Sequence, residues 1–342
     1  MMTNRRKRGI LKSQPLWGRF IVMEKLIVGV DLGGTNIRAA LADREGHILR
    51  RTKTKTLADE GPEAVLGRIK GAIRKVLPPD DQVGAIGIVA PGPLDPWRGV
   101  ILWAPNLPGW KDVPLKRILE EEFGLPTYVG NDANLAALAE QRFGAGRGVK
   151  DLIYITVSTG IGGGIIVDNR LLLGSRGFAA EVGHQTLEAH GPRCNCGNIG
   201  CLEALAAGPA IARHAVELIE GGAESLIADL VNGDLSKVTA KEVNEAAQRG
   251  DRVAAEVFRR AGFYIGVGIV NLLYLFNPSM IIIGGSVAKA GDLLFEPIWE
   301  TVNSRISEIY RHELSIVPAA LGDDVGLMGA LALVLWQEEM RR

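Results

Sequence analysis

All three cysteines of this 342-residue chain lie close together. Cys194, Cys196 and Cys201 fall within eight positions, and His184 and His190 precede them. Thiolates and a histidine nitrogen are the usual ligands of tetrahedral zinc, and a site with four protein ligands is structural rather than catalytic. Spacing alone leaves His184 and His190 open as the fourth ligand. The odd number of clustered cysteines favours a metal or redox site in a reducing compartment over a disulfide framework.

The alternative is that the three thiols are small apolar residues in a core, as free cysteines often are. Their neighbours argue against it, because glycine, asparagine and proline crowd this stretch, and Gly197 and Gly200 allow a tight loop around an ion. Two carboxylates flank the loop. Glu181 and His184 lie three positions apart, which places them on one face of a helical turn. Glu203 follows the last cysteine, and its simplest interpretation is an exposed residue at the start of a helix.

Two glycine-rich turns could bind phosphate. "DLGGT" (31–35) and "STGIGGG" (158–164) each follow a β-rich run. Glycine lets backbone N–H groups approach an anion closely, and two such turns can hold a polyphosphate between them. Neither is a Walker loop, since no Gly-Lys-Ser/Thr follows, and neither opens a helix. Asp31 could hold Mg²⁺ through water or could simply cap its turn.

The elements around these turns repeat along the chain. Residues 26–50 and 152–174 each predict a strand, a glycine turn, a second strand, a polar turn and a third strand. Alternating helices and strands follow, which indicates mostly parallel sheets. We therefore expect an α/β protein with two lobes around a cleft and the glycine turns at the strand ends, where ligands of such sheets bind.

Composition and charge narrow the partners. The formal net charge is zero, so the chain lacks the basic field that nucleic acids or anionic membranes attract. The uncharged stretch 261–288 is long enough to suggest a membrane span. Asn271, Asn277-Pro278 and Gly284-Gly285 interrupt it, and we predict a buried helix to Phe276 followed by a buried strand. Residues 1–23 are basic and make a poor signal peptide, so we expect a disordered extension or a misassigned start.

These motifs resemble the ROK family of sugar kinases and repressors. "DLGGTNIR", "STGIGGGIIVDNRLLLG", "EVGH", "CNCGNIGCLE" and "IIIGGS" match family motifs in the family's order, and the resemblance runs from residue 26 to the C-terminus. "APNLPGW" and "GNDANLAALAE" are most similar to the bacterial glucokinase branch. The resemblance implies an actin-like, hexokinase-like ATPase fold. It would divide the chain into a small lobe (24–133 plus 326–342) and a large lobe (134–325) that carries the zinc-bound sugar loop.

The resemblance also implies roles for individual residues. Asp132 would be the general base that takes the proton from the attacking sugar hydroxyl; taken alone, it would be a helix N-cap. The implied sugar-binding residues are Gly92, Asn106, Asn131, Asp132, Glu181, His184 and Glu203. The implied ATP-binding residues are Gly33, Gly34, Thr35, Asn36, Ser158, Thr159, Gly160, Gly284 and Gly285, with the last two leaving room for adenosine. The resemblance favours His184, with Cys194, Cys196 and Cys201, as zinc ligands, and Mg²⁺ is assigned to Asp31.

The expected activity is ATP-dependent phosphorylation of a hexose, foremost glucose to glucose 6-phosphate. N-acetylmannosamine, N-acetylglucosamine or another hexose is the alternative substrate. A sugar-responsive repressor is a distant alternative, because only 25 residues precede the first predicted strand, and a non-catalytic sugar-binding protein is another. We expect ATP, Mg²⁺ and Zn²⁺ as cofactors, no nucleic-acid or membrane partner, a cytoplasmic location, and a homodimer or homotetramer.

Overall fold

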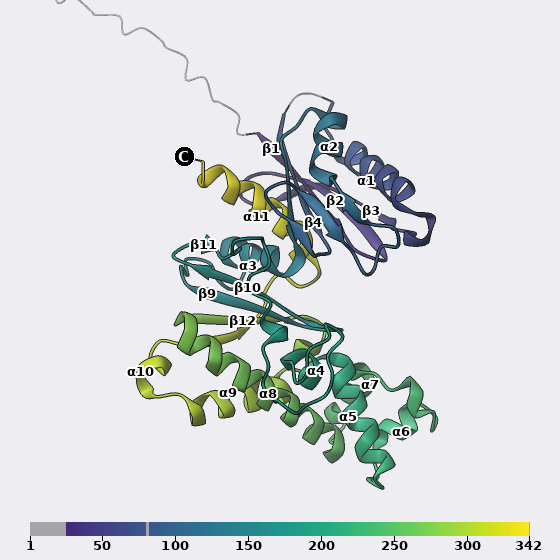
Figure 1. Cartoon of the computed structure of the whole chain (residues 1–342), viewed down its shortest axis with the longest axis vertical. Helices are drawn as coiled ribbons and strands as arrows, with labels where there is room; N and C mark the ends of the chain where they lie inside the picture. The colour runs from purple at the N-terminus through teal and green to yellow at the C-terminus, as the bar shows by residue number, and fades with distance from the viewer. Residues whose placement is uncertain (1–24, 80–81, 342) are drawn as a thin grey trace, which may run out of the picture.

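The computed structural model describes residues 25–79 and 82–341 (Figure 1). The expectation for residues 1–23 lies outside this part of the chain. Two five-stranded sheets form the frame. The first sheet has the order β3 (Ile48–Lys55), β2 (Asn36–Ala42), β1 (Leu26–Leu32), β4 (Val83–Ala90), β8 (Thr127–Asn131). The second has the order β11 (Arg170–Leu171), β10 (Ile161–Val167), β9 (Leu152–Val157), β12 (Met280–Gly284), β13 (Ser315–Pro318).

The two sheets repeat one pattern. In each, three antiparallel strands come first, β1-β2-β3 and β9-β10-β11, and two strands then extend the sheet in parallel. Both glycine turns connect the first strand of their sheet to the second. The sequence-based prediction of a duplicated hairpin unit in a two-lobed α/β fold is therefore confirmed.

A helical layer joins the two sheets. α3 (Asp132–Phe143) follows β8 and α11 (Val325–Glu339) follows β13, and the two helices pack against each other between the sheets (Figure 1). Their core includes Ile27 of the first sheet and Ile282 of the second. The predicted lobe boundary after residue 133 falls within α3, which contacts both sheets, so that division by residue number stays a proposal.

Other helices cover the outer faces. α1 (Pro62–Val76) and α2 (Leu115–Phe123) pack on the first sheet, beside a small sheet of β5 (Leu94–Asp95), β6 (Val100–Trp103) and β7 (Lys111–Val113). α8 (Arg252–Phe276) and α9 (Asp292–Arg305) pack on the second. The remaining α-helices of the described chain are α4 (Leu202–Ala206), α5 (Gly208–Glu220), α6 (Leu226–Leu230), α7 (Ala240–Gln248) and α10 (Glu308–Arg311).

The uncharged stretch folds as predicted. α8 ends at Phe276, and Asn277 caps it in the left-handed conformation (φ 46°) that asparagine tolerates. The chain then enters β12, where Ile281 to Ile283 are fully buried. Within residues 25–79 and 82–341, no helix is both long and apolar enough to cross a bilayer.

Candidate functional site

Thr56, the residue that follows β3, supports the first glycine turn by hydrogen bonds. The Thr56 side chain is fully buried; its hydroxyl donates to the Gly33 carbonyl (2.6 Å), and its N–H donates to the Thr35 carbonyl (2.9 Å). Gly34 and Thr35 remain exposed at the tip. Asn106 lies against this turn, since a Cβ on Gly34 would come within 3.2 Å of the Asn106 Cβ. An expected sugar contact and an expected phosphate turn are thus neighbours.

A hollow of about 510 Å³ opens beside the first turn. It is lined by Asp31, Gly33, Gly34, Thr35, Asn36, Arg38, Lys53, Gly322, Asp323 and Val325. The carboxylate of Asp31 accepts hydrogen bonds from Arg38 Nε (2.9 Å) and Nη2 (2.5 Å). Sequence reasoning assigned Mg²⁺ to Asp31 and missed Arg38, although the two face each other across β1 and β2. The Mg²⁺ role of Asp31 stays a proposal.

The second glycine turn is held by contacts with two other elements. Ser158 Oγ lies 2.9 Å from Ser286 Oγ beyond β12, and the Ser158 carbonyl accepts from Gly208 N–H (2.8 Å) at the start of α5. Within the turn, Ser158 N–H donates to the Gly160 carbonyl (2.9 Å). The turn is therefore fixed to the helices that follow the cysteine cluster.

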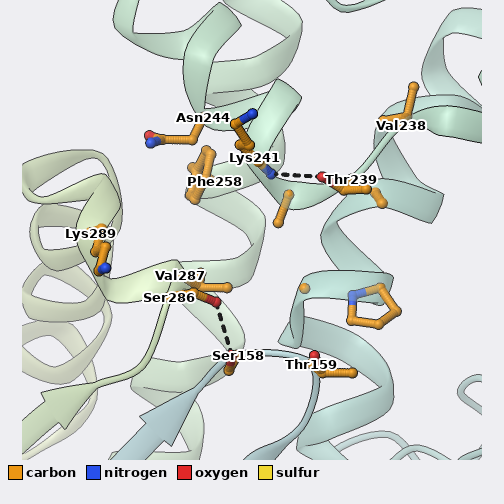
Figure 2. A pocket seen from close by; sticks show the side chains of 14 residues that line it. Ser158, Thr159, Val238, Thr239, Lys241, Asn244, Phe258, Ser286, Val287 and Lys289 are labelled. Atoms are coloured by element: carbon orange, nitrogen blue, oxygen red, sulfur yellow. Dashed lines mark hydrogen bonds between the residues drawn. The ribbon is translucent and has the colours of Figure 1, made fainter. Parts of the chain in front are cut away.

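A cavity of about 730 Å³ opens beside the second turn (Figure 2). It is lined by Ser158, Thr159, Gly208, Pro209, Ala212, Val238, Thr239, Ala240, Lys241, Asn244, Phe258, Ser286, Val287 and Lys289. Apolar side chains with a few polar groups and two lysines suit a nucleoside that carries phosphates. From the sequence, only Ser158 and Thr159 of these residues are assigned to ATP. Ser286 ends the motif "IIIGGS" without a role of its own, and no motif marks the residues on α5, α7 and α8.

Three glycines expected at the ATP site line neither this cavity nor the hollow beside the first turn: Gly160, Gly284 and Gly285. A Cβ on Gly284 would lie 2.3 Å from the Tyr154 hydroxyl, and one on Gly285 (φ 91°) would lie 2.2 Å from the Val157 carbonyl. These contacts show that β9 requires glycine at both positions, and the expectation that Gly284 and Gly285 leave room for adenosine stays a prediction.

Asn131 and Asp132 stand at the junction of β8 and α3. Asn131 is the N-cap, since its Oδ1 accepts from Asn134 N–H (2.9 Å). The alternative that Asp132 is the N-cap is therefore wrong; its own Oδ1 accepts from Ala133 N–H (2.8 Å). Gly92 is adjacent, because its Cβ position lies 4.0 Å from Asn131 Nδ2.

Asp132 has the environment of a proton acceptor. It is surrounded by many protein atoms, yet its side chain is open to solvent. Desolvation raises the pKa of Asp132, and the negative charge of Asp31 raises it further. A carboxylate with a raised pKa is a better general base near neutral pH.

Two more carboxylates belong to the same site. Burial raises the pKa of Glu181, the negative charges of Asp132 and Glu203 add to that rise, and His184 opposes it. Glu203 is half-buried, and its Oε2 accepts from Ile161 N–H (2.9 Å). Glu203 does lie in the first turn of α4, as expected, but the prediction that it is exposed is wrong, because it ties the cysteine loop to the second glycine turn.

The cysteine cluster has the geometry of a zinc site. The ligand atoms of His184, Cys194, Cys196 and Cys201 all lie within 4.8 Å of one another. Cys196 Sγ and Cys201 Sγ are 3.7 Å apart, and Cys194 Sγ and His184 Nδ1 are 3.8 Å apart. Zn–S bonds of about 2.3 Å in a tetrahedron place sulfurs about 3.8 Å apart, so the residues fit Zn²⁺. His190 is exposed and does not belong to the cluster.

Comparisons with known proteins agree over nearly the whole chain. The model of the ROK family matches residues 27–337. A glucokinase of Thermotoga maritima is 37% identical over 313 residues, which are 91% of this chain and 98% of that protein. A crystal structure of a ROK family glucokinase from Streptomyces griseus, in complex with glucose and AMPPNP, has a TM-score of 0.76 and 39% identity, covering 92% of this chain and 99% of the other.

The same fold also occurs in regulators. A xylose repressor of Caldicellulosiruptor bescii is 35% identical to this chain and is matched over 90% of this chain and 78% of the repressor. The glucokinases are matched over almost their full length, whereas more than a fifth of the repressor has no counterpart here.

Proposed function

Because this chain belongs to the ROK family, we propose that it is an ATP-dependent hexose kinase that converts glucose to glucose 6-phosphate. One observation carries the proposal. The charge of Asp132 is coupled to Asp31, beside the first glycine turn, and to Glu181, beside the cysteine cluster. A single carboxylate is thus within electrostatic reach of both the phosphate-binding and the sugar-binding candidates.

The phosphoryl transfer follows from this placement. Asp132 accepts the proton of the sugar hydroxyl while that oxygen bonds to the γ-phosphorus, and the bond from the γ-phosphorus to the bridging oxygen breaks to release ADP. Mg²⁺, held near Asp31, would neutralise charge on the phosphates. The two glycine turns supply backbone N–H donors, which stabilise the charge that develops on the transferred group.

The sugar is proposed to lie against Asn106, Asn131, Glu181, His184 and Glu203. His184 presents Nδ1 to the thiols, which leaves Nε2 for a sugar hydroxyl. Zn²⁺ bound by the three cysteines and His184 would fix the loop, so that its carboxylates are already oriented before the sugar arrives. A polar group that the bound sugar covers and leaves unpaired would make a wrong epimer costly.

We further propose a cytoplasmic homodimer or homotetramer. The thiols and the ATP requirement fit a reducing, ATP-containing compartment. The proposed subunit contact is made by exposed apolar side chains on α8 and α10: Phe263, Tyr274, Leu275 and Ile309 are 38%, 51%, 74% and 80% exposed. Apolar side chains gathered on a surface mark association sites. Light scattering of Leu275→Glu should show smaller particles than the wild type.

A coupled assay of ADP release tests the function, with glucose, mannose, fructose, N-acetylglucosamine and N-acetylmannosamine as substrates. We expect turnover that is fastest with glucose. Faster turnover on an acetylated amino sugar would keep the mechanism and change the substrate. No turnover on any sugar, together with sugar-dependent binding to a DNA operator, would instead assign the chain to the repressors that share its fold.

A further inference from the structure

A row of three charged residues crosses the first sheet next to its glycine turn. Strand register places Asp31 of β1 opposite Arg38 of β2, and Arg38 opposite Lys53 of β3. Residues opposite each other in a sheet share one face. All three also line the hollow beside the turn, so the row faces the space where a phosphate bound to the turn would lie.

Of the two cations in this row, Arg38 is already paired with a described residue and Lys53 is not. Arg38 Nε and Nη2 donate to Asp31, and Nη1 donates to the Asp323 carbonyl (2.5 Å). Lys53 is exposed and has no carboxylate within ion-pair distance in residues 25–79 and 82–341. Asp323 is the other charged residue of the hollow. Its carboxylate lies beyond ion-pair reach of Lys53, so the lysine ammonium is free to receive an anion.

The position of the row identifies which phosphate it meets. The nucleoside cavity belongs to the second turn and to α5 and α7, so a phosphate chain that starts there presents its far end to the first turn. Asp31 is close enough to Asp132 to influence the proton affinity of that base. The row therefore lies at the reacting end of the donor.

We propose that Lys53 binds the terminal phosphate of the phosphoryl donor and that it acts independently of the nucleoside. The inference rests on the proposed kinase function and adds to it a donor-binding residue. A lysine is a compact point charge with rotatable donors, which suits a phosphate oxygen that moves during transfer.

The competing explanation is that Lys53 merely protects an edge strand. β3 is the edge of its sheet, and lysines on such edges discourage pairing with other strands. Arg50 provides the matched control, because it lies on the same strand and carries the same charge. It points to the opposite face, where its Nη1 lies 3.4 Å from the Leu77 carbonyl after α1.

The test measures binding of inorganic tripolyphosphate, ATP and AMP by calorimetry in Mg²⁺ buffer. We expect Lys53→Gln to weaken tripolyphosphate and ATP roughly tenfold, the size of one charge-assisted hydrogen bond. AMP binding should not change, because AMP lacks the terminal phosphate. Arg50→Gln should leave all three affinities within about twofold of those of the wild type, because Arg50 lies on the opposite face of the sheet and salt screens its exposed charge.

Three outcomes would overturn the inference. The first is that Lys53→Gln binds tripolyphosphate as tightly as the wild type does. The second is that Arg50→Gln loses as much tripolyphosphate affinity as Lys53→Gln. The third is that the wild type binds no tripolyphosphate. Each of these leaves the kinase proposal standing if glucose is phosphorylated. Conversely, a Lys53-dependent tripolyphosphate site in a protein that phosphorylates no sugar would refute the kinase function alone.

Discussion

The two halves of this molecule share one strand plan but hold their glycine turns in different ways. The first turn is supported within its own sheet, by the buried hydroxyl of Thr56. The second turn depends on residues far away in sequence: Ser286 beyond β12 and Glu203 beyond the cysteine loop. The first half has a single helix between its third and fourth strands. The second has the cysteine loop and five helices there. Duplication therefore explains the two turns, and the insertion explains the cavity beside the second turn and the cysteine loop.

The helices that end the two halves differ in the same way. α3 follows β8 and begins at Asp132, whereas α11 follows β13 and begins just after Asp324. Asp324 lies 3.4 Å from Arg51 in an exposed ion pair, while Asp132 has no cationic partner among the described residues. The N-cap Asp324 of α11 is thus paired with a cation, whereas Asp132, the first residue of α3 after its N-cap Asn131, is not.

The largest effect should come from these two aspartates. Asp132→Asn should lower kcat by about 10²–10⁴-fold, the usual contribution of a general base, while glucose binding persists. Asp324→Asn should change kcat by less than about threefold. In the wild type, the raised pKa of Asp132 means that the acidic limb of kcat/KM, where the base takes up its proton, lies at a higher pH than an ordinary aspartate would give. A pH–rate profile should lose this acidic limb in Asp132→Asn. Equal losses in both variants would contradict the assignment.

The next largest effect is that of zinc loss, which should weaken ligand binding at the second turn but not at the first. Cys194→Ser, or removal of zinc by a chelator, should weaken glucose binding by about tenfold or more, in line with the effect of losing groups that orient a site. AMP binding should weaken too, because Cys194 Sγ lies 3.6 Å from Glu203 Oε1 and Glu203 also binds Ile161 N–H. Tripolyphosphate binding at the first turn should not change. His190→Ala is the control and should keep its zinc.

If AMP binding survives metal loss, Glu203 does not connect the two sites. If tripolyphosphate binding falls as well, the two turns are not independently supported. Zinc content by elemental analysis, measured on the same samples, shows whether each variant lost its metal.

A smaller effect tests the Glu203 contact directly. A Cβ on Gly160 would lie 2.6 Å from Glu203 Oε2, so Gly160→Ala should displace that carboxylate from Ile161. Loss of one hydrogen bond costs about 1 kcal/mol, and we expect AMP affinity to fall about fivefold. Gly67→Ala on α1, where a Cβ meets nothing within 4 Å, should leave AMP affinity unchanged. Normal AMP affinity in Gly160→Ala would mean that Glu203 does not position the second turn.

The same contrast shows what could be predicted from sequence. Both hairpins, the ends of α2 and α8 and the cysteine cluster follow from local signals: glycine and asparagine caps, strand alternation and ligand spacing. The Asp31–Arg38 pair needed the strand register, which apolar patterning leaves undetermined at an exposed row. The cavity beside the second turn brings residues of α5 and α7 to Ser158 and Thr159. No local sequence pattern predicts that these residues lie side by side, because their positions depend on how the inserted helices pack.

The smallest effect concerns a strained residue beside the cysteine loop of the second half. Ala180 precedes Glu181 and adopts φ 68°, which costs an L-residue about 1–2 kcal/mol. The hairpin turns avoid this cost, with Gly46 in the first half and Asp168 and Asn169 in the second. Ala180→Gly should therefore raise the free energy of unfolding by about 0.5 kcal/mol, because relief of strain exceeds the entropy that glycine loses on folding. Ala179→Gly, with no positive φ to relieve, should lower it. Thermal denaturation of the two variants measures both changes in the free energy of unfolding.

A lower stability in Ala180→Gly would mean that the alanine methyl packs well enough to outweigh its strained backbone. A gain in stability with a loss of glucose affinity would mean instead that the strain helps to hold Glu181 in place.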